Sequence, residues 1–339
     1  MAKLFEPFQI KNLTMKNRIV MPPMCMYSAN DDGLLTPFHF AHYGARIIGG
    51  VGTIILESTG VTPNGRITNN DLGLWADDHI AGLKSIVDFG HQHHAVMGIQ
   101  LNHAGRRSRV IGVQAIAPTT EAFADISAPR MITKEEIKAL PGLFQAAAKR
   151  ALTAGFDFIE IHAAHGYLLD EFLSPLGNKR TDEYGGSEDN RLRLLKEIAI
   201  AIREVWPKEK MLQVRVSAED YAEGGLHQED LASIINKIKD VGIDMGNVSS
   251  GGVAVVRVND YPGYQVGFAQ HIKAKTGLPV IAGGLIEDPL MAEAFLKSGH
   301  ADFIYFGREL LRNPQYPLEA ARALQAEIPW PVQYERAKR

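Results

Sequence analysis

The chain has 339 residues, of which 45% are hydrophobic and 22% are charged, and its formal net charge at pH 7 is −3. A charge this close to zero gives no reason to expect binding to nucleic acid or to a membrane surface. The single cysteine, Cys25, excludes an internal disulfide and a cysteine-ligated metal cluster. We expect neither a signal peptide nor a membrane span, because the first residues lack an apolar core and no apolar run reaches about 18 residues. A reducing, cytoplasmic setting is therefore expected.

Short β-branched runs alternate with longer helical patterns along the chain. The expected strands lie at residues 17–23, 51–58, 95–103, 156–164, 211–217, 243–250, 278–284 and 301–307. Helical patterns between them include Lys134–Ala154, Asn190–Val205, Glu229–Val241 and Pro289–Ser298. Near-continuous apolar strands separated by helices predict a closed parallel (β/α)8 barrel, with a doubly wound open sheet as the alternative.

A recurring glycine marks the entry to several of these strands. The stretches "IGGVGTIILE", "TAGFDFIEIH", "DVGIDMGNVS" and "KSGHADFIYF" each place glycine between a helical pattern and the next apolar run. Glycine in the left-handed conformation commonly ends a helix in this way. Because no linker-like stretch divides the chain, we expect a single domain over residues 1–339, with long insertions at about 103–133 and 165–190 and a tail at about 326–339.

The C-terminal ends of the expected strands carry polar residues or glycine, although the runs before them are apolar. In a (β/α)8 barrel these ends meet at one face, and that face holds the active site. The candidate functional residues are therefore Pro23, Met24, Cys25, Glu57, Ser58, Gln100, His103, His162, His165, Tyr167, Arg215, Ser249, Ser250, Gly283, Gly284, Gly307 and Arg308.

His162, His165 and Tyr167 follow directly on the apolar run "FDFIEI". Residues three apart on a continuing strand face opposite sides, so the two imidazoles meet only if the strand ends near His162 and the chain turns. Three interpretations are open: ligands of a metal, histidines of the core, or two neutral donors that bind one oxygen atom. In the third, Tyr167 keeps its proton at neutral pH and is suited to protonate a carbanion or an enolate.

Arg215 lies within the expected strand "MLQVRVS", where alternation places it on one face with Gln213 and Ser217. An arginine on a central strand needs a counter-charge, because an unpaired buried cation is costly. A buried Asp or Glu is one candidate partner, and the anionic edge of a reduced flavin is the other.

Glycines follow the last two strands in "IAGGLIED" and "YFGREL". We expect helices to begin just after them, which favours a phosphate site, because backbone N–H groups and helix N-termini bind anions there. Arg308 adds a positive charge beside Gly307. No Gly-x-Gly-x-x-Gly motif follows a strand, so a separate Rossmann dinucleotide site is not expected.

Several of these stretches together resemble one family. The stretches "NRIVMPPMCMYS", "LTPFHFAHY", "GIQLNHAGR", "GFDFIEIHAAHGYLLDEFLSPLGNKRTDEYGGSEDNR", "VRVSAEDY", "FGRELLRNP" and "PVQYER" are similar to the Old Yellow Enzyme family of flavin-dependent ene-reductases. The similarity is greatest to its bacterial, thermophilic-like NADPH dehydrogenase subclass, and it extends from about Leu4 to Arg336.

The resemblance implies a tightly but non-covalently bound FMN at the top of the barrel, with NADPH as reductant. It implies that the flavin is contacted by Pro23, Met24, Cys25, Ser58, Gln100 and Arg215, and its phosphate by Gly283, Gly284, Gly307 and Arg308. It also implies that hydride from the reduced flavin reduces the C=C bond of enones and enals. In that reaction, the carbonyl oxygen is bound by His162 and His165, the α-carbon is protonated by Tyr167, and the pocket is lined by Tyr27.

The C-terminal stretch "EIPWPVQYERAKR" is expected to be extended, because Pro329 and Pro331 disfavour a helix and Trp330, Val332 and Tyr334 alternate. The resemblance implies that this tail completes the substrate pocket of a neighbouring subunit with Tyr334 and Arg336. A homo-oligomer, either a dimer or a tetramer, is therefore expected.

Other functions remain open from the sequence. A metal-dependent barrel hydrolase would use His103 with His162 and His165, and a non-catalytic flavin-binding protein would bind FMN without turnover. The dienoyl-CoA reductase type is excluded, because it requires an iron–sulfur cluster and a second nucleotide domain. The sequence departs from the resembling family at Ser58, where alanine is frequent, and at Asn102, where a smaller residue is expected.

Overall fold

The structure, a computed structural model, describes residues 2–338. The first residue of the expected domain and the last residue of the expected tail lie outside this range. Eight strands form a closed barrel in which every neighbouring pair is parallel. The barrel strands are β3 Ile19–Met21, β4 Thr53–Gly60, β5 Val96–Asn102, β8 Phe158–Ala163, β9 Met211–Ser217, β10 Met245–Ser249, β11 Val280–Ala282 and β12 Phe303–Tyr305. Each lies within or overlaps one of the expected strands, so the (β/α)8 barrel is confirmed and the open sheet is wrong.

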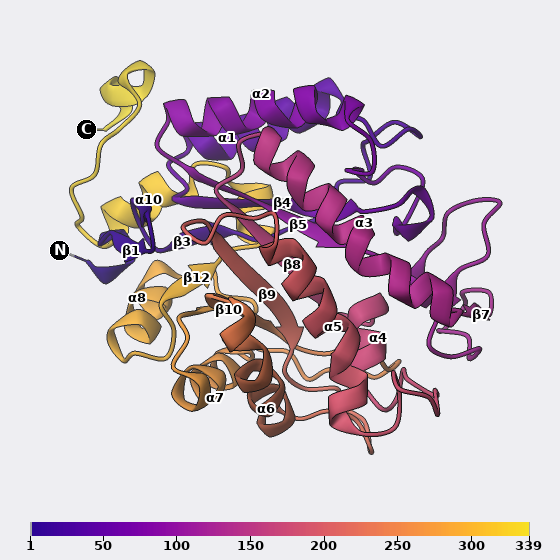
Figure 1. Cartoon of the computed structure of the whole chain (residues 1–339). Helices are drawn as coiled ribbons and strands as arrows, with labels where there is room; N and C mark the ends of the chain where they lie inside the picture. Colours follow the sequence, from indigo (N-terminus) through magenta and orange to yellow (C-terminus); the bar gives the residue numbers. More distant parts are fainter. Residues whose placement is uncertain (1, 339) are drawn as a thin grey trace.

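Helices surround the barrel (Figure 1). They are α1 Pro37–Ile48, α2 Asp78–Gln92, α3 Lys134–Thr153, α4 Leu168–Leu173, α5 Glu188–Arg203, α6 Gln228–Ile238, α7 Val266–Thr276, α8 Pro289–Lys297, α9 Arg308–Arg312 and α10 Tyr316–Ala323. Short 3-10 helices lie at Lys3–Phe5, Pro63–Gly65, Gly105–Arg107, Lys239–Val241 and Val332–Ala337. Within residues 2–338, none of the helices has the length and the hydropathy that a membrane span requires.

The glycine junctions have the expected conformation. Gly50, Gly155, Gly242 and Gly299 all have positive φ, between 77° and 109°, and each lies between a helix and the following strand. A residue with a side chain is strained at these angles, so glycine allows the chain to leave the helix and enter the sheet.

The lower interior of the barrel is apolar. It is filled by Val20, Ile55, Val96, Phe158, Met211, Met245, Ile281 and Phe303. An antiparallel hairpin, β1 Phe8–Ile10 and β2 Leu13–Met15, adds Leu13 and Met15 to this cluster. The sequence analysis did not identify this hairpin. It packs against the N-terminal end of the barrel.

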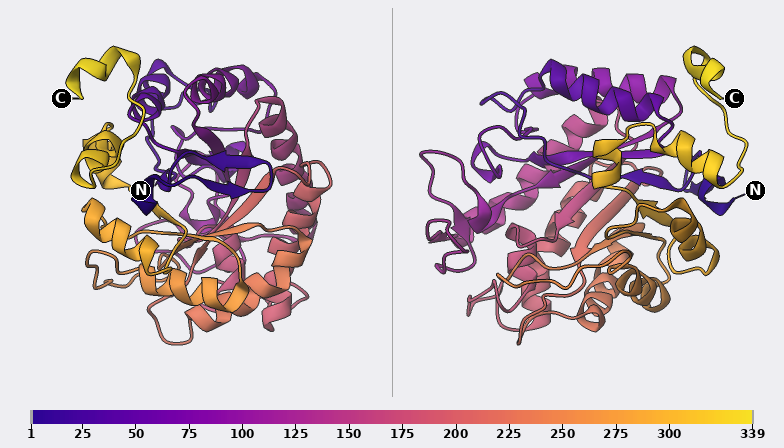
Figure 2. Two further views of the ribbon diagram at one scale, coloured as in Figure 1. Left: turned by 90° about the vertical axis from the view of Figure 1, so that its left-hand side faces the viewer. Right: turned by 180° about the vertical axis from the view of Figure 1, so that it is seen from behind.

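The two long insertions lie at the C-terminal ends of β5 and β8. The first contains β6 Ile116–Ala117 and β7 Arg130–Met131, which pair in parallel, and the second contains α4. The described segments nearest the two ends of the chain lie on the other side of the molecule from β7 and α4 (Figures 1 and 2). The barrel therefore has an open, elaborated face and a closed face.

The tail differs from its expected conformation. Val332–Ala337 forms a 3-10 helix rather than an extended strand, and every described residue from Val332 to Lys338 is exposed. Pro331 precedes this helix in an extended conformation, with ψ of 134°. The two prolines thus keep only the segment before the helix extended, since proline is well tolerated immediately before or at a helix start.

Candidate active site

His162, His165 and Tyr167 meet where β8 ends. The ring centroids of His162 and His165 are 5.3 Å apart, and the two rings are nearly perpendicular, at 86°. The ring of Tyr167 lies 4.9 Å from that of His162. Because β8 stops at Ala163 and the chain then turns, side chains that would face opposite sides of a longer strand come together.

The turn that carries His165 is held from several directions. His165 and Gly166 both have left-handed backbone conformations, with φ of 61° and 69°. The N–H of His165 donates to Ser217 Oγ at 2.9 Å, and the carbonyl of His165 accepts from the guanidinium of Arg107. The N–H of Gly166 donates to Asp170 Oδ2 at 2.7 Å. A non-glycine residue at φ above zero is uncommon, and these contacts stabilise it.

Burial sets the charge of the three side chains. Burial lowers the pKa of His162 and of His165 well below the ordinary value, and the positive charges of Arg215 and Arg107 add to this effect. Burial raises the pKa of Tyr167, so the phenol keeps its proton at neutral pH. The site therefore combines two neutral imidazoles with one protonated phenol, and each imidazole has one N–H to donate.

A hydrogen bond holds the ring of His165 in place. Its Nε2 lies 2.7 Å from Ser249 Oγ, and Gln265 Nε2 also contacts Ser249 Oγ, at 3.2 Å. A hydroxyl can accept from the amide of Gln265 and donate its own proton to His165 Nε2, and this arrangement places the imidazole proton on Nδ1.

Arg215 is a buried cation that no acidic side chain of the described residues contacts directly. Arg215 is buried, its Nε has no hydrogen-bond partner, and it forms no ion pair with any residue from 2 to 338. Its guanidinium lies 5.7 Å from the ring centroid of Tyr305. Glu160, two residues before His162, is also fully buried and binds amide groups instead. A buried Asp or Glu in direct contact with Arg215, one of the two expected alternatives, is thus not found among the described residues.

The segment after β3 carries Cys25 and Tyr27. Burial raises the pKa of the half-buried Cys25 thiol, which is therefore protonated at neutral pH. Tyr27 is 52% exposed and has φ of 51°. The carboxylate of Glu57, which is fully buried, accepts from the N–H of Met26 at 2.7 Å and from the hydroxyl of Tyr43 at 3.2 Å. Glu57 thus fixes the backbone between Cys25 and Tyr27.

The glycines after β11 and β12 provide unpaired backbone donors. Within residues 2–338, the N–H groups of Gly283, Gly284 and Gly307 have no hydrogen-bond acceptor. Arg308 is exposed and forms no ion pair with the described residues. One expectation is wrong here: Gly307 directly precedes α9, but α8 begins at Pro289, so a loop separates Gly284 from that helix.

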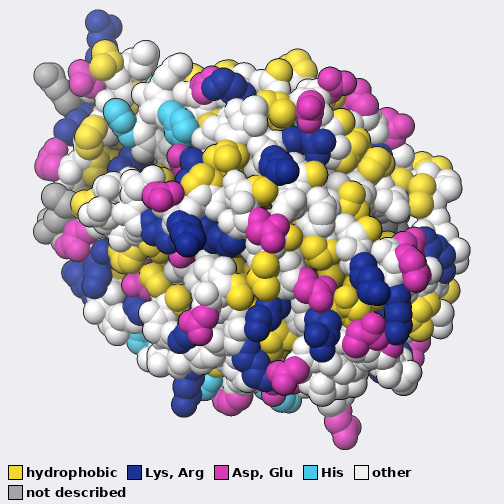
Figure 3. All heavy atoms as spheres, viewed as in Figure 1, with side chains coloured by type: hydrophobic (Ala, Val, Ile, Leu, Met, Phe, Trp, Pro, Cys, Tyr) yellow, Lys and Arg dark blue, Asp and Glu magenta, His cyan; other side chains and the backbone are white. Residues whose placement is uncertain are grey.

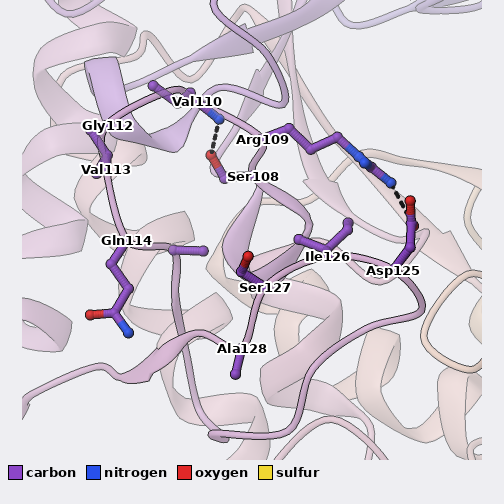
Figure 4. A pocket seen from close by; sticks show the side chains of 11 residues that line it. Ser108, Arg109, Val110, Gly112, Val113, Gln114, Asp125, Ile126, Ser127 and Ala128 are labelled. Atoms are coloured by element: carbon purple, nitrogen blue, oxygen red, sulfur yellow. Dashed lines mark hydrogen bonds and ion pairs between the residues drawn. The ribbon is translucent and has the colours of Figure 1, made fainter.

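Two cavities lie beside these residues rather than among them. One, of about 350 Å³, lies within the β5–α3 insertion, where Arg109 and Asp125 form an ion pair of 2.9 Å (Figure 4). The other, of about 410 Å³, is lined by Met26, Phe38, Ala41, His42, Arg46 and Leu311. On the face shown in Figure 3, Lys and Arg side chains alternate with Asp and Glu, as the small net charge leads one to expect.

Comparison with known proteins agrees with this arrangement. The model of the NADH:flavin oxidoreductase / NADH oxidase family matches residues 3–327. The chain is 52% identical to the NADPH dehydrogenase of Clostridium acetobutylicum over 337 residues, which cover 99% of both chains. It is 50% identical to the NADPH dehydrogenase of Bacillus subtilis over 336 residues, 98% of each chain. The chain belongs to the NADH:flavin oxidoreductase family.

Solved structures give the same result. Morphinone reductase superposes with a TM-score of 0.82 at 28% identity, covering 97% of this chain and 91% of its own. The old yellow enzyme homologue from Zymomonas mobilis superposes with a TM-score of 0.81 at 29% identity, covering 97% and 94%. The resemblance to the Old Yellow Enzyme family is confirmed, and the chain is an FMN-dependent oxidoreductase that uses a reduced nicotinamide.

The site of this flavin oxidoreductase fits the cofactor of its family. A reduced flavin offers a negative charge to Arg215, whose Nε has no hydrogen-bond partner, and a phosphate offers acceptors to the unpaired N–H groups of Gly283, Gly284 and Gly307. Arg215 lies near the C-terminal end of β9, and the glycines follow the C-terminal ends of β11 and β12.

The alternative metal site has no set of ligands. Within residues 2–338, no three His, Cys, Asp or Glu side chains lie close enough together to bind one metal ion. His103 instead accepts from the N–H of Gly105 at 3.2 Å, and burial lowers the pKa of His103 to about 4. Family membership favours the flavin oxidoreductase over the hydrolase.

The two departures from the family pattern contact each other. Asn102 Nδ2 donates to Ser58 Oγ at 2.7 Å, and both side chains are buried at the C-terminal ends of the paired strands β4 and β5. Asn102 Oδ1 has no hydrogen-bond partner. The hydroxyl of Ser58 thus accepts a hydrogen bond from the amide NH₂ of Asn102.

Four supporting residues were not assigned a function from the sequence. They are Glu57, Arg107, Ser217 and Ser249, which contact Met26 or His165. Glu57 and Ser249 were noticed as polar strand ends, and Ser217 as a residue on the face of Arg215. Sequence alone does not show which backbone group such a side chain will meet.

Proposed function

We propose that this protein reduces the activated C=C bond of α,β-unsaturated carbonyl compounds, such as enones and enals, with NADPH as reductant. The observation that supports the proposal is the pair of neutral imidazoles of the buried His162 and the half-buried His165 beside the protonated phenol of Tyr167. Two N–H donors that converge on one carbonyl oxygen polarise the conjugated double bond and stabilise the charge that develops on the oxygen.

Each residue of this group has a separate task. His162 and His165 bind and orient the carbonyl oxygen. Tyr167 holds the proton that is delivered to the α-carbon, and its raised pKa prevents early loss of that proton. Tyr27, largely exposed at the same face, lines the substrate pocket. Substrate binding is favoured by desolvation, since hydrogen bonds to a carbonyl are stronger where water is excluded.

FMN supplies the redox chemistry when bound, by taking a hydride from the nicotinamide and passing it to the alkene. We propose that the residues along the flavin ring are Pro23, Met24, Cys25, Ser58 and Gln100. Arg215 opposes the negative charge of the reduced ring. The phosphate is held by Gly283, Gly284, Gly307 and Arg308, and the unpaired N–H groups and the unpartnered Nε of Arg215 described above support this placement.

The names of the relatives support NADPH rather than NADH as reductant, because those from Clostridium acetobutylicum and Bacillus subtilis are both called NADPH dehydrogenase. We propose that the nicotinamide and the alkene use the same face of the barrel in turn. This order requires no separate dinucleotide domain. A cytoplasmic location, where NADPH is regenerated, fits this activity.

We propose that residues 1–339 act as one domain whose tail, about 326–339, reaches a neighbouring subunit of a homo-oligomer, either a dimer or a tetramer. Tyr334 and Arg336 are exposed, and the tail lies on the other side of the molecule from the open face (Figure 2). This position supports a contribution of these two residues to a neighbour's substrate pocket rather than to their own.

The test is a two-step spectroscopic assay on the purified protein. Anaerobic NADPH is expected to bleach the visible absorption of bound flavin, and cyclohexenone is expected to restore it with formation of cyclohexanone. Flavin that remains oxidised with NADPH, or reduced flavin that cyclohexenone does not reoxidise, would contradict the proposal.

A further inference from the structure

Glu160 lies in the barrel interior and has no role in the function proposed above. Its side chain is fully buried, and three primary amides converge on it. Gln100 Nε2 donates to Oε1 at 2.7 Å, whereas Gln213 Nε2 and Asn247 Nδ2 donate to Oε2 at 2.6 and 2.7 Å. These amides come from β5, β9 and β10, so Glu160 links four strands below the open face.

The amides identify the charge of this carboxyl group. An amide NH₂ group only donates, so all three contacts require acceptor atoms on Glu160. A protonated carboxyl would have one acceptor position fewer, so three donors fit a carboxylate better, and hydrogen bonds to ionised acceptors are the stronger kind. Burial raises the pKa of Glu160 above its ordinary value, and Arg215 and the three amides reduce that increase.

The positive charge that acts on Glu160 is that of Arg215, which lies two residues beyond Gln213 on β9. In the register of the barrel, Glu160 pairs with Gln213, and His162 pairs with Arg215. The carboxylate and the guanidinium thus lie in successive layers of the interior. They form no direct ion pair, because the amides already satisfy the carboxylate and Arg215 Nε is left without a partner.

We infer that Glu160 is a positioning residue: it is the buried counter-charge of Arg215, and its amide shell keeps that arginine free for the flavin. This inference rests on the proposed role of Arg215 toward FMN. Glu160 balances the cation while no negative flavin is present, which limits the cost of burying it. The amides prevent a direct ion pair that would remove the guanidinium from the cofactor.

The same contacts fix the amide of Gln100. Because its Nε2 donates to Glu160, the amide has one defined orientation, with the remaining N–H and the carbonyl directed elsewhere. Gln100 is a proposed flavin contact, so Glu160 sets which of its groups the cofactor meets. One carboxylate thereby acts through two residues, Arg215 and Gln100.

The test is the FMN midpoint potential of Glu160→Gln, measured with a dye couple on the purified holoprotein. Removing the carboxylate leaves the positive charge of Arg215 unopposed, so the anionic reduced flavin is favoured and the potential rises. A unit charge at about 10 Å and an effective dielectric constant of about 20 changes the ratio of reduced to oxidised affinity about tenfold. For a two-electron couple, a tenfold change is about 30 mV.

Two further variants separate charge from packing. E160Q/Q213E exchanges carboxylate and amide between paired strands, keeps one negative charge in the cluster, and should return the potential toward that of the parent protein. Asn247→Leu removes one donor without changing the charge, and should leave the potential near the parent value despite lower stability. A purely structural role of Glu160 would make E160Q and N247L alike.

The inference is overturned if E160Q holds FMN at the parental potential, or if the exchange variant does not restore it. Absence of FMN from the parent protein would instead contradict the proposed function. If E160Q does not fold, E160Q/R215M removes the unopposed cation as well and should fold again. A double variant that is as unfolded as E160Q would overturn the counter-charge relation.

Discussion

The hydrogen bond between His165 and Ser249 gives a prediction about how the carbonyl oxygen is bound. Ser249→Ala removes the hydroxyl that lies 2.7 Å from His165 Nε2 and leaves the ring packed in place. Without that partner, the proton is no longer restricted to Nδ1. We expect the affinity for a phenol, whose oxygen takes the place of the carbonyl oxygen, to fall by the value of one neutral hydrogen bond. That value is about 0.5–1.5 kcal/mol, or about 2- to 12-fold in Kd.

The small change in phenol affinity expected for Ser249→Ala distinguishes it from loss of the His165 side chain. His165→Ala removes one donor to the oxygen and should cost about 10²–10³ in enone turnover. Ser250→Ala is the matched control, because Ser250 Oγ contacts Tyr221 and Gln265 and has no hydrogen bond with His165. Its affinity for phenol should equal that of the parent protein.

The assay is a titration of the flavin absorption with phenol, together with ¹⁵N NMR of histidine-labelled protein. The spectrum should show the proton of His165 on Nδ1 in the parent protein and a mixture of tautomers in Ser249→Ala. A parent protein with the proton on Nε2, or a Ser249→Ala variant that binds phenol as tightly as the parent, would refute the reasoning.

Four further predictions follow from the site and the tail. Tyr167→Phe should slow reoxidation by an alkene and leave flavin reduction by NADPH intact; the reverse in stopped flow would contradict its role as proton donor. Cys25→Ser should retain FMN and shift its midpoint potential, and an unchanged potential with unchanged substrate affinity would make Cys25 a packing residue. Arg336→Ala should weaken nicotinamide or substrate binding at unchanged FMN content. When Arg336→Ala subunits exchange with Tyr167→Phe subunits, the mixture should be more active than either variant alone. No gain in activity would contradict a shared site. Because His103 has a pKa of about 4 when folded and about 6.5 when unfolded, the unfolded state binds more protons between these values. Its contribution to stability should therefore fall by about 2 kcal/mol from pH 7 to pH 5, and His103→Asn should flatten the pH dependence of the urea midpoint.

The barrel was predictable because its signals are local and repeated. Each strand is a short apolar run, and several are entered through a glycine whose positive φ the structure then shows, as at Gly155 and Gly242. The meeting of His162 and His165 also followed from local reasoning, since it requires only that a strand end and a chain turn. Such features depend on a few neighbouring residues and on one rule of backbone geometry.

Other features were not predictable because they depend on contacts between distant segments. The hairpin β1–β2 is too short to show a clear alternation, and it is stabilised by packing against the barrel interior. The start of α8 at Pro289 was predicted, but the loop between Gly284 and this helix was not, because no local signal fixes its conformation. The contact of Glu57 with Met26 spans 31 residues, and neither residue alone indicates it.

The pair of Ser58 and Asn102 shows why a departure from a family pattern is best interpreted in space. Considered one at a time, a serine in place of alanine and an asparagine in place of a smaller residue are two unrelated changes to the pocket. In the structure, they form one hydrogen bond between adjacent strand ends, and the donor of the amide is satisfied by the hydroxyl. Its oxygen remains unpaired and buried, and an unpaired buried acceptor is unfavourable unless a partner is supplied. Ser58 and Asn102 together therefore add one unsatisfied acceptor, Asn102 Oδ1, to the region of the proposed flavin contacts. They are not two separate changes of side-chain volume.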